Sequence, residues 1–82
     1  MVTVAEIRLT WLPLQNGTFC AMLGRHEVAF VMKRQAMSDW AWRISHCNGT
    51  GETGFRYEPT LEGAKAEVLA GIQEWFRQAG FQ

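Results

Sequence analysis

The chain has 82 residues, a length that fits one small domain and buries only about 60% of the surface of its unfolded form. Apolar residues make up 48% of the chain and charged residues 20%, which excludes a disordered or fibrous protein. Eight basic and eight acidic side chains cancel. This balance disfavours nucleic acid as a partner, because binding to phosphates needs a broad positive field.

No apolar run approaches the roughly 18 residues of a membrane helix. The first fourteen residues are interrupted by Glu6, Arg8 and Pro13, so we expect neither a membrane span nor a signal peptide and a cytoplasmic location. Cys20 and Cys47 are then expected to be reduced thiols, since that compartment is reducing.

Two turn signals divide the first half of the chain into strands. Asn16-Gly17 is typical of a two-residue hairpin turn, because both residues tolerate positive φ. Gly24-Arg25 predicts a second hairpin. Residues 40–47 alternate as a further strand with the two tryptophans facing inward, and residues 55–57 are compatible with a short last strand before Pro59.

The length of each turn sets the register and so the face of every side chain. With two-residue turns, Leu14 lies opposite Phe19 and Leu23 lies opposite His26. The predicted core face then consists of Leu12, Leu14, Phe19, Ala21, Leu23, Val28, Phe30 and Met32. The predicted second face consists of Trp11, Cys20, Met22, Glu27, Ala29, Val31 and Lys33.

The last part of the chain predicts a helix over about residues 61–79. Thr60 is a good N-cap, because its hydroxyl can accept a hydrogen bond from a free amide of the first turn, and Gly80 ends the pattern. Apolar residues recur with a period near 3.6 at Leu61, Ala64, Val68, Ile72, Trp75 and Ala79. We therefore predict a single α+β domain over residues 1–82, in two layers. An antiparallel β-meander of three to four strands, within residues 5–57, packs on one C-terminal helix.

Gly49, Gly51 and Gly54 have the G-x-G-x-x-G spacing of a loop that holds a dinucleotide. Such a loop must lead directly into a helix, whose first amides bind the phosphates. Here the loop leads to Phe55 and then to Pro59. We therefore expect no nucleotide site and no bound cofactor.

Metal binding and covalent catalysis lack the spacing that they need. Cys20, His26, His46 and Cys47 include no C-x-x-C pair, which structural zinc sites usually have. Ser45, His46 and Cys47 are neighbours in a strand pattern, so successive side chains point to opposite faces. A nucleophile and its base are therefore not brought together. We expect no metal site, no catalytic residues and no enzymatic activity.

The remaining feature is the second sheet face, which one helix cannot cover. An apolar surface rimmed by charge is typical of association sites, and Trp, Met and Arg are enriched there. A bulge at Pro13 would instead turn Trp11 into the core. The candidate interaction residues are Trp11, Met22, Val31 and Arg43.

The predicted function is a non-enzymatic interaction module whose partner is another protein or a second copy in a homodimer. The alternative is a nucleic-acid-binding domain that uses the exposed sheet face. Its candidate residues are Arg8, Lys33, Arg34 and Arg43, with Trp11 as a stacking ring.

The order of signals, from "LTWLPLQNGTFCAML" through "HEVAFVM" and "DWAWRIS" to "PTLEGAKAEVLAGIQEW", resembles small stand-alone proteins of phages and mobile elements that fold as a β-meander followed by one helix. This resemblance implies a phage or mobile-element accessory protein that binds a host or phage protein, including the possibility of an inhibitor of bacterial defence. The layout is also similar to double-stranded RNA-binding domains, but their first helix and lysine-rich helix entry are missing.

Overall fold

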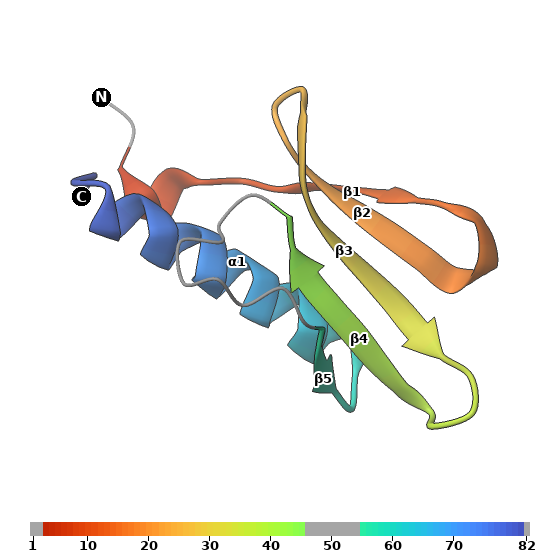
Figure 1. Ribbon diagram of the computed structural model, residues 1–82. Helices are drawn as coiled ribbons and strands as arrows, with labels where there is room; N and C mark the ends of the chain where they lie inside the picture. Colours follow the sequence, from red (N-terminus) through yellow and green to blue (C-terminus); the bar gives the residue numbers. More distant parts are fainter. Residues whose placement is uncertain (1–2, 46–54, 82) are drawn as a thin grey trace.

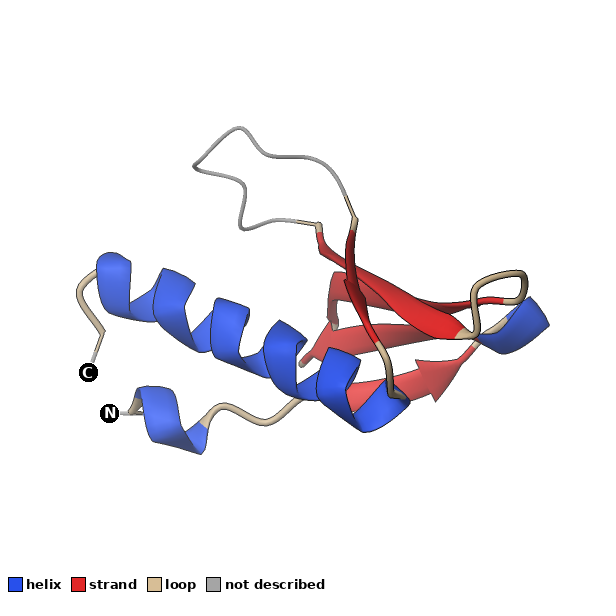
Figure 2. Ribbon diagram, turned by 90° about the horizontal axis from the view of Figure 1, so that it is seen from below, coloured by secondary structure: helices blue, strands red, loops and turns tan. Residues whose placement is uncertain are grey.

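The computed structural model describes residues 3–45 and 55–81. The elements in chain order are η1 (Val4–Glu6), β1 (Thr10–Pro13), η2 (Gln15–Gly17), β2 (Thr18–Leu23), β3 (His26–Arg34), β4 (Asp39–Ile44), β5 (Arg56–Glu58) and α1 (Leu61–Gln78). The strands form one antiparallel sheet in the order β1-β2-β3-β4-β5, and α1 crosses one face of it (Figures 1 and 2). The predicted two-layer α+β meander is confirmed, with the short β5 as a fifth strand.

The first hairpin differs from the prediction in the length of its turn. Three residues, Gln15–Gly17, form η2 between the strands, and the amide of Leu14 donates to the carbonyl of Thr18 at 2.7 Å. Asn16 and Gly17 both have positive φ, at 61° and 70°. Because of the extra loop residue, Trp11 pairs with Ala21. The side chains of β1 therefore point to the faces opposite to those predicted.

The second hairpin has the predicted two-residue turn, since Leu23 pairs with His26. Further along, the register shifts by one residue: Met22 pairs with Glu27, whereas Ala21 pairs with Ala29. Val28 is thus the extra residue of a β-bulge. The bulge exchanges the two faces of β3 for all residues beyond it.

The helix begins and ends as predicted. The Thr60 hydroxyl accepts a hydrogen bond from the Gly63 amide at 3.0 Å, which confirms the N-cap. A Cβ on Gly63 would lie 3.0 Å from the Thr60 hydroxyl and 3.1 Å from a carboxylate oxygen of Glu58. A larger residue at this position would therefore require these two side chains to shift slightly.

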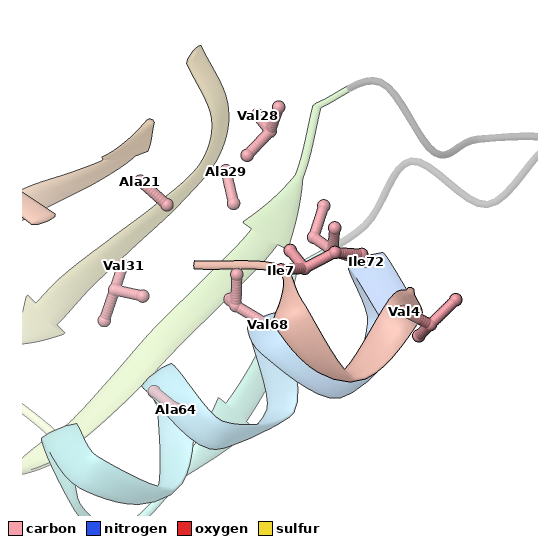
Figure 3. Close-up of a cluster of buried hydrophobic side chains, with 9 residues drawn as sticks. All are labelled: Val4, Ile7, Ala21, Val28, Ala29, Val31, Ala64, Val68 and Ile72. Carbon is pink, nitrogen blue, oxygen red and sulfur yellow. The ribbon is translucent and has the colours of Figure 1, made fainter. Parts of the chain in front are cut away.

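The core lies between the sheet and one stripe of α1. Its buried residues are Val4, Ile7, Ala21, Val28, Ala29, Val31, Ala64, Val68 and Ile72 (Figure 3). The sequence did not predict η1, which brings Val4 and Ile7 into this core. This segment lies beside the C-terminal half of α1 (Figures 1 and 2), where Gln73 donates to the carbonyl of Val4 at 3.5 Å.

The predicted core face is half right. Phe19, Ala21, Leu23 and Val28 do face the helix side, and Trp40, Trp42 and Ile44 pack against the core as predicted. The other four predicted core residues do not belong to it. Leu12 and Leu14 are exposed and Phe30 and Met32 are half-buried on the other face.

Replacing Ile72 with alanine should destabilise the fold strongly. The side chain is 1% exposed, so its truncation leaves a cavity and should cost about 2 to 5 kcal/mol of unfolding free energy. Urea denaturation measures this loss. The exposed Glu67 on the same helix is the control, and Glu67→Ala should change stability by about 0.5 kcal/mol or less. Equal effects of the two variants would contradict the assigned core.

The close approach of α1 to β4 at Gly71 predicts a coupled pair. A Cβ on Gly71 would overlap the Cδ1 atom of Ile44, so Gly71→Ala should destabilise the wild type although alanine is the better helix former by about 1 kcal/mol. Ile44→Val removes Cδ1 and should make the alanine acceptable. Urea denaturation of the four proteins should show a coupling of about 0.5 kcal/mol or more between the two sites. Additive effects would mean that the helix does not pack at this distance.

Candidate interaction surface

The sheet has a second face, which points away from α1. Directly paired residues share a face, so Leu12, Cys20, Phe30 and Arg43 form one row across four strands. A second row contains Thr18, Met32, Ala41 and Tyr57. We call this surface the open face and define its main residues as Leu12, Cys20, Met22, Phe30, Met32, Ala41, Arg43 and Tyr57.

The open face is apolar and accessible. Leu12 and Tyr57, near the two edges of the sheet, are 43% and 49% exposed, and Met22, Phe30 and Met32 between them are half-buried. None of these side chains contributes to the core cluster. The helix α1 lies on the other side of the sheet (Figure 2), so among the described residues no helix packs over this surface.

Cys20 lies in the middle of the open face, between Leu12 and Phe30, and is only 3% exposed. Its Sγ atom is 3.4 Å from the Sδ atom of Met22. Burial raises the pKa of the Cys20 thiol, and the neighbouring Glu27 carboxylate raises it further. A protonated, covered thiol is a poor nucleophile and a poor metal ligand. Cys20 therefore acts here as a packing residue.

An ion pair ties the far end of the open face together. Arg34 on β3 donates to both carboxylate oxygens of Asp39 on β4, at 2.7 Å and 2.6 Å. The Arg34 guanidinium also lies 3.8 Å from the ring centre of Tyr57 on β5. Its hydrogen bonds hold the pKa of the Asp39 carboxyl below its ordinary value. One arginine thus connects three strands.

Arg43 differs from Arg34 because it has no carboxylate partner in the part of the chain that the structure describes. Its side chain is exposed, and its guanidinium lies 5.8 Å from the ring centre of Phe55. Among the described residues, no acidic side chain forms an ion pair with it. Within residues 3–45 and 55–81, the open face therefore combines an apolar centre with the unpaired positive charge of Arg43.

The structure divides the four predicted interaction residues into two pairs. Met22 and Arg43 lie on the open face, as predicted. The predicted placement of Trp11 and Val31 is wrong. Val31 is fully buried in the core, and the Trp11 ring packs against that core with the Lys65 ammonium 5.3 Å above it. The longer η2 turn moves Trp11 to the helix side, and the bulge at Val28 does the same for Val31.

Six of the eight open-face residues were missing from the predicted interaction set: Leu12, Phe30, Met32, Tyr57, Cys20 and Ala41. The first three were assigned to the core, because the assumed register placed them there. Tyr57 lies in the short last strand, and its alternation with Arg56 indicates a face only once β5 is known to pair with β4.

The residues proposed for nucleic-acid binding are not brought together. Trp11 and Lys33 lie on the helix face by register, and Arg34 is engaged by Asp39. Arg43 remains on the open face, and Arg8 is exposed in the segment between η1 and β1.

Residues 3–45 and 55–81 contain no cluster of three or more His, Cys, Asp or Glu side chains that could hold a metal ion. The glycine-rich loop and the candidate ligands His46 and Cys47 lie outside the described residues. In the same ranges, no helix is both long and apolar enough to cross a membrane.

Comparisons with protein-family models, with curated proteins and with solved structures found no match to this chain. The resemblance to small phage and mobile-element proteins therefore stays a hypothesis. The open face itself is the structural basis for a functional proposal.

The lowered pKa of Asp39 predicts a pH-dependent contribution to stability. A carboxyl whose pKa is lower in the folded state stabilises the fold above its unfolded pKa, near 3.8, and this contribution disappears as the pH falls through the folded value. Thermal unfolding of wild type and Asp39→Asn should therefore differ most at neutral pH and converge in acid. A difference that stays constant with pH would contradict the ion pair. Glu74→Gln, at an exposed site 4.0 Å from Arg77, is the control and should change little.

Proposed function

We propose that the protein is a small non-enzymatic binding module that holds a protein partner against its open face. The observation that supports this most directly is the apolar surface that runs from Leu12 on β1 to Tyr57 on β5. Soluble monomers rarely expose a contiguous apolar surface of large size, and such surfaces usually mark interaction sites. Met, Phe, Tyr and Arg are also the residue types enriched in interface centres.

The proposal of a binding module is preferred to that of an enzyme because of how the polar groups are arranged. Covalent catalysis needs a nucleophile held against a base. The described part of the open face holds one thiol, that of Cys20, whose pKa is raised by burial. The charged pair at the far end of this face, Arg34 and Asp39, is engaged in mutual hydrogen bonds. These features suit packing and recognition better than proton transfer.

The biological role that we propose is that of an accessory protein of a phage or mobile element, with inhibition of a host protein as one form of it. The basis is the resemblance in the order of strand, turn and helix signals. A domain with one binding face and no other machinery is sufficient for such a role, because covering a functional surface of the target inhibits it.

A second candidate function is binding of single-stranded nucleic acid on the same face. It is favoured by two arginine–aromatic contacts, Arg34 over Tyr57 and Arg43 over Phe55, because bases stack on such platforms. A labelled thymidine oligonucleotide titrated at low salt tests it, since phosphate contacts are strongest there. Absence of binding at low salt would eliminate this candidate.

The proposed function predicts that a partner contacts Leu12 and does not contact Met37. Both side chains are exposed, at 43% and 62%, but Met37 lies in the turn between β3 and β4. A photo-crosslinking amino acid placed at Leu12 should capture a partner in the native cell, which mass spectrometry identifies, and one placed at Met37 should not. Equal capture at both positions would contradict the proposal.

The identified partner, once purified, should bind the wild type and not an open-face variant. Leu12→Glu/Tyr57→Glu should weaken the affinity about tenfold or more, as substitutions in an interface centre do. Met37→Glu adds the same chemistry outside the face and should leave the affinity unchanged. Calorimetry measures binding, and far-UV circular dichroism checks that each variant is folded. A double variant that binds like the wild type would eliminate the open face as the site.

A further inference from the structure

We infer that the partner of the open face is an apolar protein surface that presents a carboxylate to Arg43, and that it is not a second copy of this chain. This inference rests on the proposed function and specifies the chemistry of the partner.

The position of Arg43 is the first argument. It pairs with Phe30 of the neighbouring strand, and its guanidinium lies near the ring of Phe55 on the other side. Apolar side chains thus flank the charge on two sides. A partner large enough to contact both rings also covers the guanidinium between them.

Covering Arg43 removes water from a charge that has no ion-pair partner among the described residues. A buried, unpaired charge costs several kcal/mol, which would offset the benefit of apolar contact. A carboxylate removes this penalty, because it can accept two parallel hydrogen bonds from one guanidinium. The partner must therefore bring an anionic acceptor to this point.

The chain cannot supply that acceptor from the described open face. Asp39 already accepts two hydrogen bonds from Arg34. Glu27 pairs with Met22, and its carboxylate neighbours the Cys20 thiol. Among the described residues, neither carboxylate forms an ion pair with Arg43.

The distribution of charged side chains on the open face also argues against a second copy of this chain as the partner. A two-fold dimer joins identical patches, so each Arg43 would face the open face of the other copy, where Asp39 already accepts two hydrogen bonds from Arg34. Each copy would offer the other only Glu27, near the end of β3, as a free carboxylate within the described open face.

A carboxylate is favoured over a phosphate because the positive charge is isolated. Nucleic-acid surfaces follow a phosphate backbone with several cations, whereas the only unpaired cation in the main rows of the described open face is Arg43. The net charge of the whole chain is zero.

Selection from a library of short random peptides displayed on a surface, against the full chain, tests this inference even while the natural partner is unidentified. Selected peptides should contain Asp or Glu flanked by large apolar residues. Their affinity should fall about tenfold or more with Arg43→Glu, as for loss of a central charged contact. Exchanging the acidic peptide residue for lysine should restore binding to Arg43→Glu and abolish binding to the wild type.

Arg77→Glu is the matched control, since it makes the same charge change on α1, and it should leave the affinity unchanged. Circular dichroism checks that both variants are folded. Failure to select any peptide, selection of peptides without acidic residues, or equal affinity for wild type and Arg43→Glu would each overturn the inference. So would sedimentation showing a wild-type dimer that Leu12→Glu/Tyr57→Glu dissociates, or oligonucleotide binding that Arg43→Glu abolishes.

Failure of this inference can be distinguished from failure of the proposed function. If Leu12→Glu/Tyr57→Glu abolishes binding of the natural partner while Arg43→Glu does not, the open face is an interface, and the inference that the partner presents a carboxylate to Arg43 is wrong. If neither variant weakens that binding, both proposals fail.

Discussion

The packing of α1 against one face of the sheet is the contact on which the rest of the structure depends. Ala64, Val68 and Ile72 form its buried stripe, and they belong to one buried cluster with Ala29 and Val31 of β3. Gly71 lets the helix approach Ile44 of β4 closely. Because one helix covers one face, a five-stranded sheet keeps a second face that has no layer of its own in the described chain.

Two local features decide which side chains occupy the open face. The three-residue turn η2 sets the register of β1, and the bulge at Val28 sets the register of β3 beyond it. Each inserts one residue, and a one-residue slip exchanges the two faces of a strand. The bulge buries Val31 and turns Phe30 outward, and the turn places Leu12 on the open face. The chemistry of the candidate interface is thus set by turn and bulge geometry as much as by composition.

The sequence was sufficient to predict the helix and the strands, but it was insufficient to predict the register in which the strands pair. Thr60, Gly80 and the apolar period define α1, and the alternation of Trp40 and Trp42 assigns the faces of β4 correctly. The predicted faces of β2 and β4 residues, such as Met22 and Arg43, are correct because neither strand contains an insertion. The predicted faces of residues on β1 and on β3 beyond the bulge, such as Trp11 and Val31, are wrong. Asn16-Gly17 is compatible with turns of two or three residues, and nothing in the sequence around Val28 marks the bulge.

The polar contacts of the sheet also could not be predicted from the sequence, because they too depend on how the strands pair. Arg34 and Asp39 are five residues apart across a turn, and their pairing depends on a hairpin whose loop length the sequence does not reveal. The contact of Arg34 with Tyr57 depends in addition on the pairing of β5 with β4. That Arg43 has no ion-pair partner among the described residues becomes visible only when the strands on both sides of β4 are in place. Local signals thus predict elements, whereas site chemistry depends on pairings between distant segments.

The central claim, that the face opposite α1 is an accessible apolar surface, is tested most directly by methyl NMR of the dilute protein with a soluble paramagnetic agent. The methyl signals of Met22 and Met32 should broaden, those of the exposed Met37 should broaden further, and those of the buried Val31 and Val68 should remain sharp. Protection of Met22 and Met32 equal to that of Val31, independent of protein concentration, would contradict the account, because those side chains would then belong to the core of the monomer.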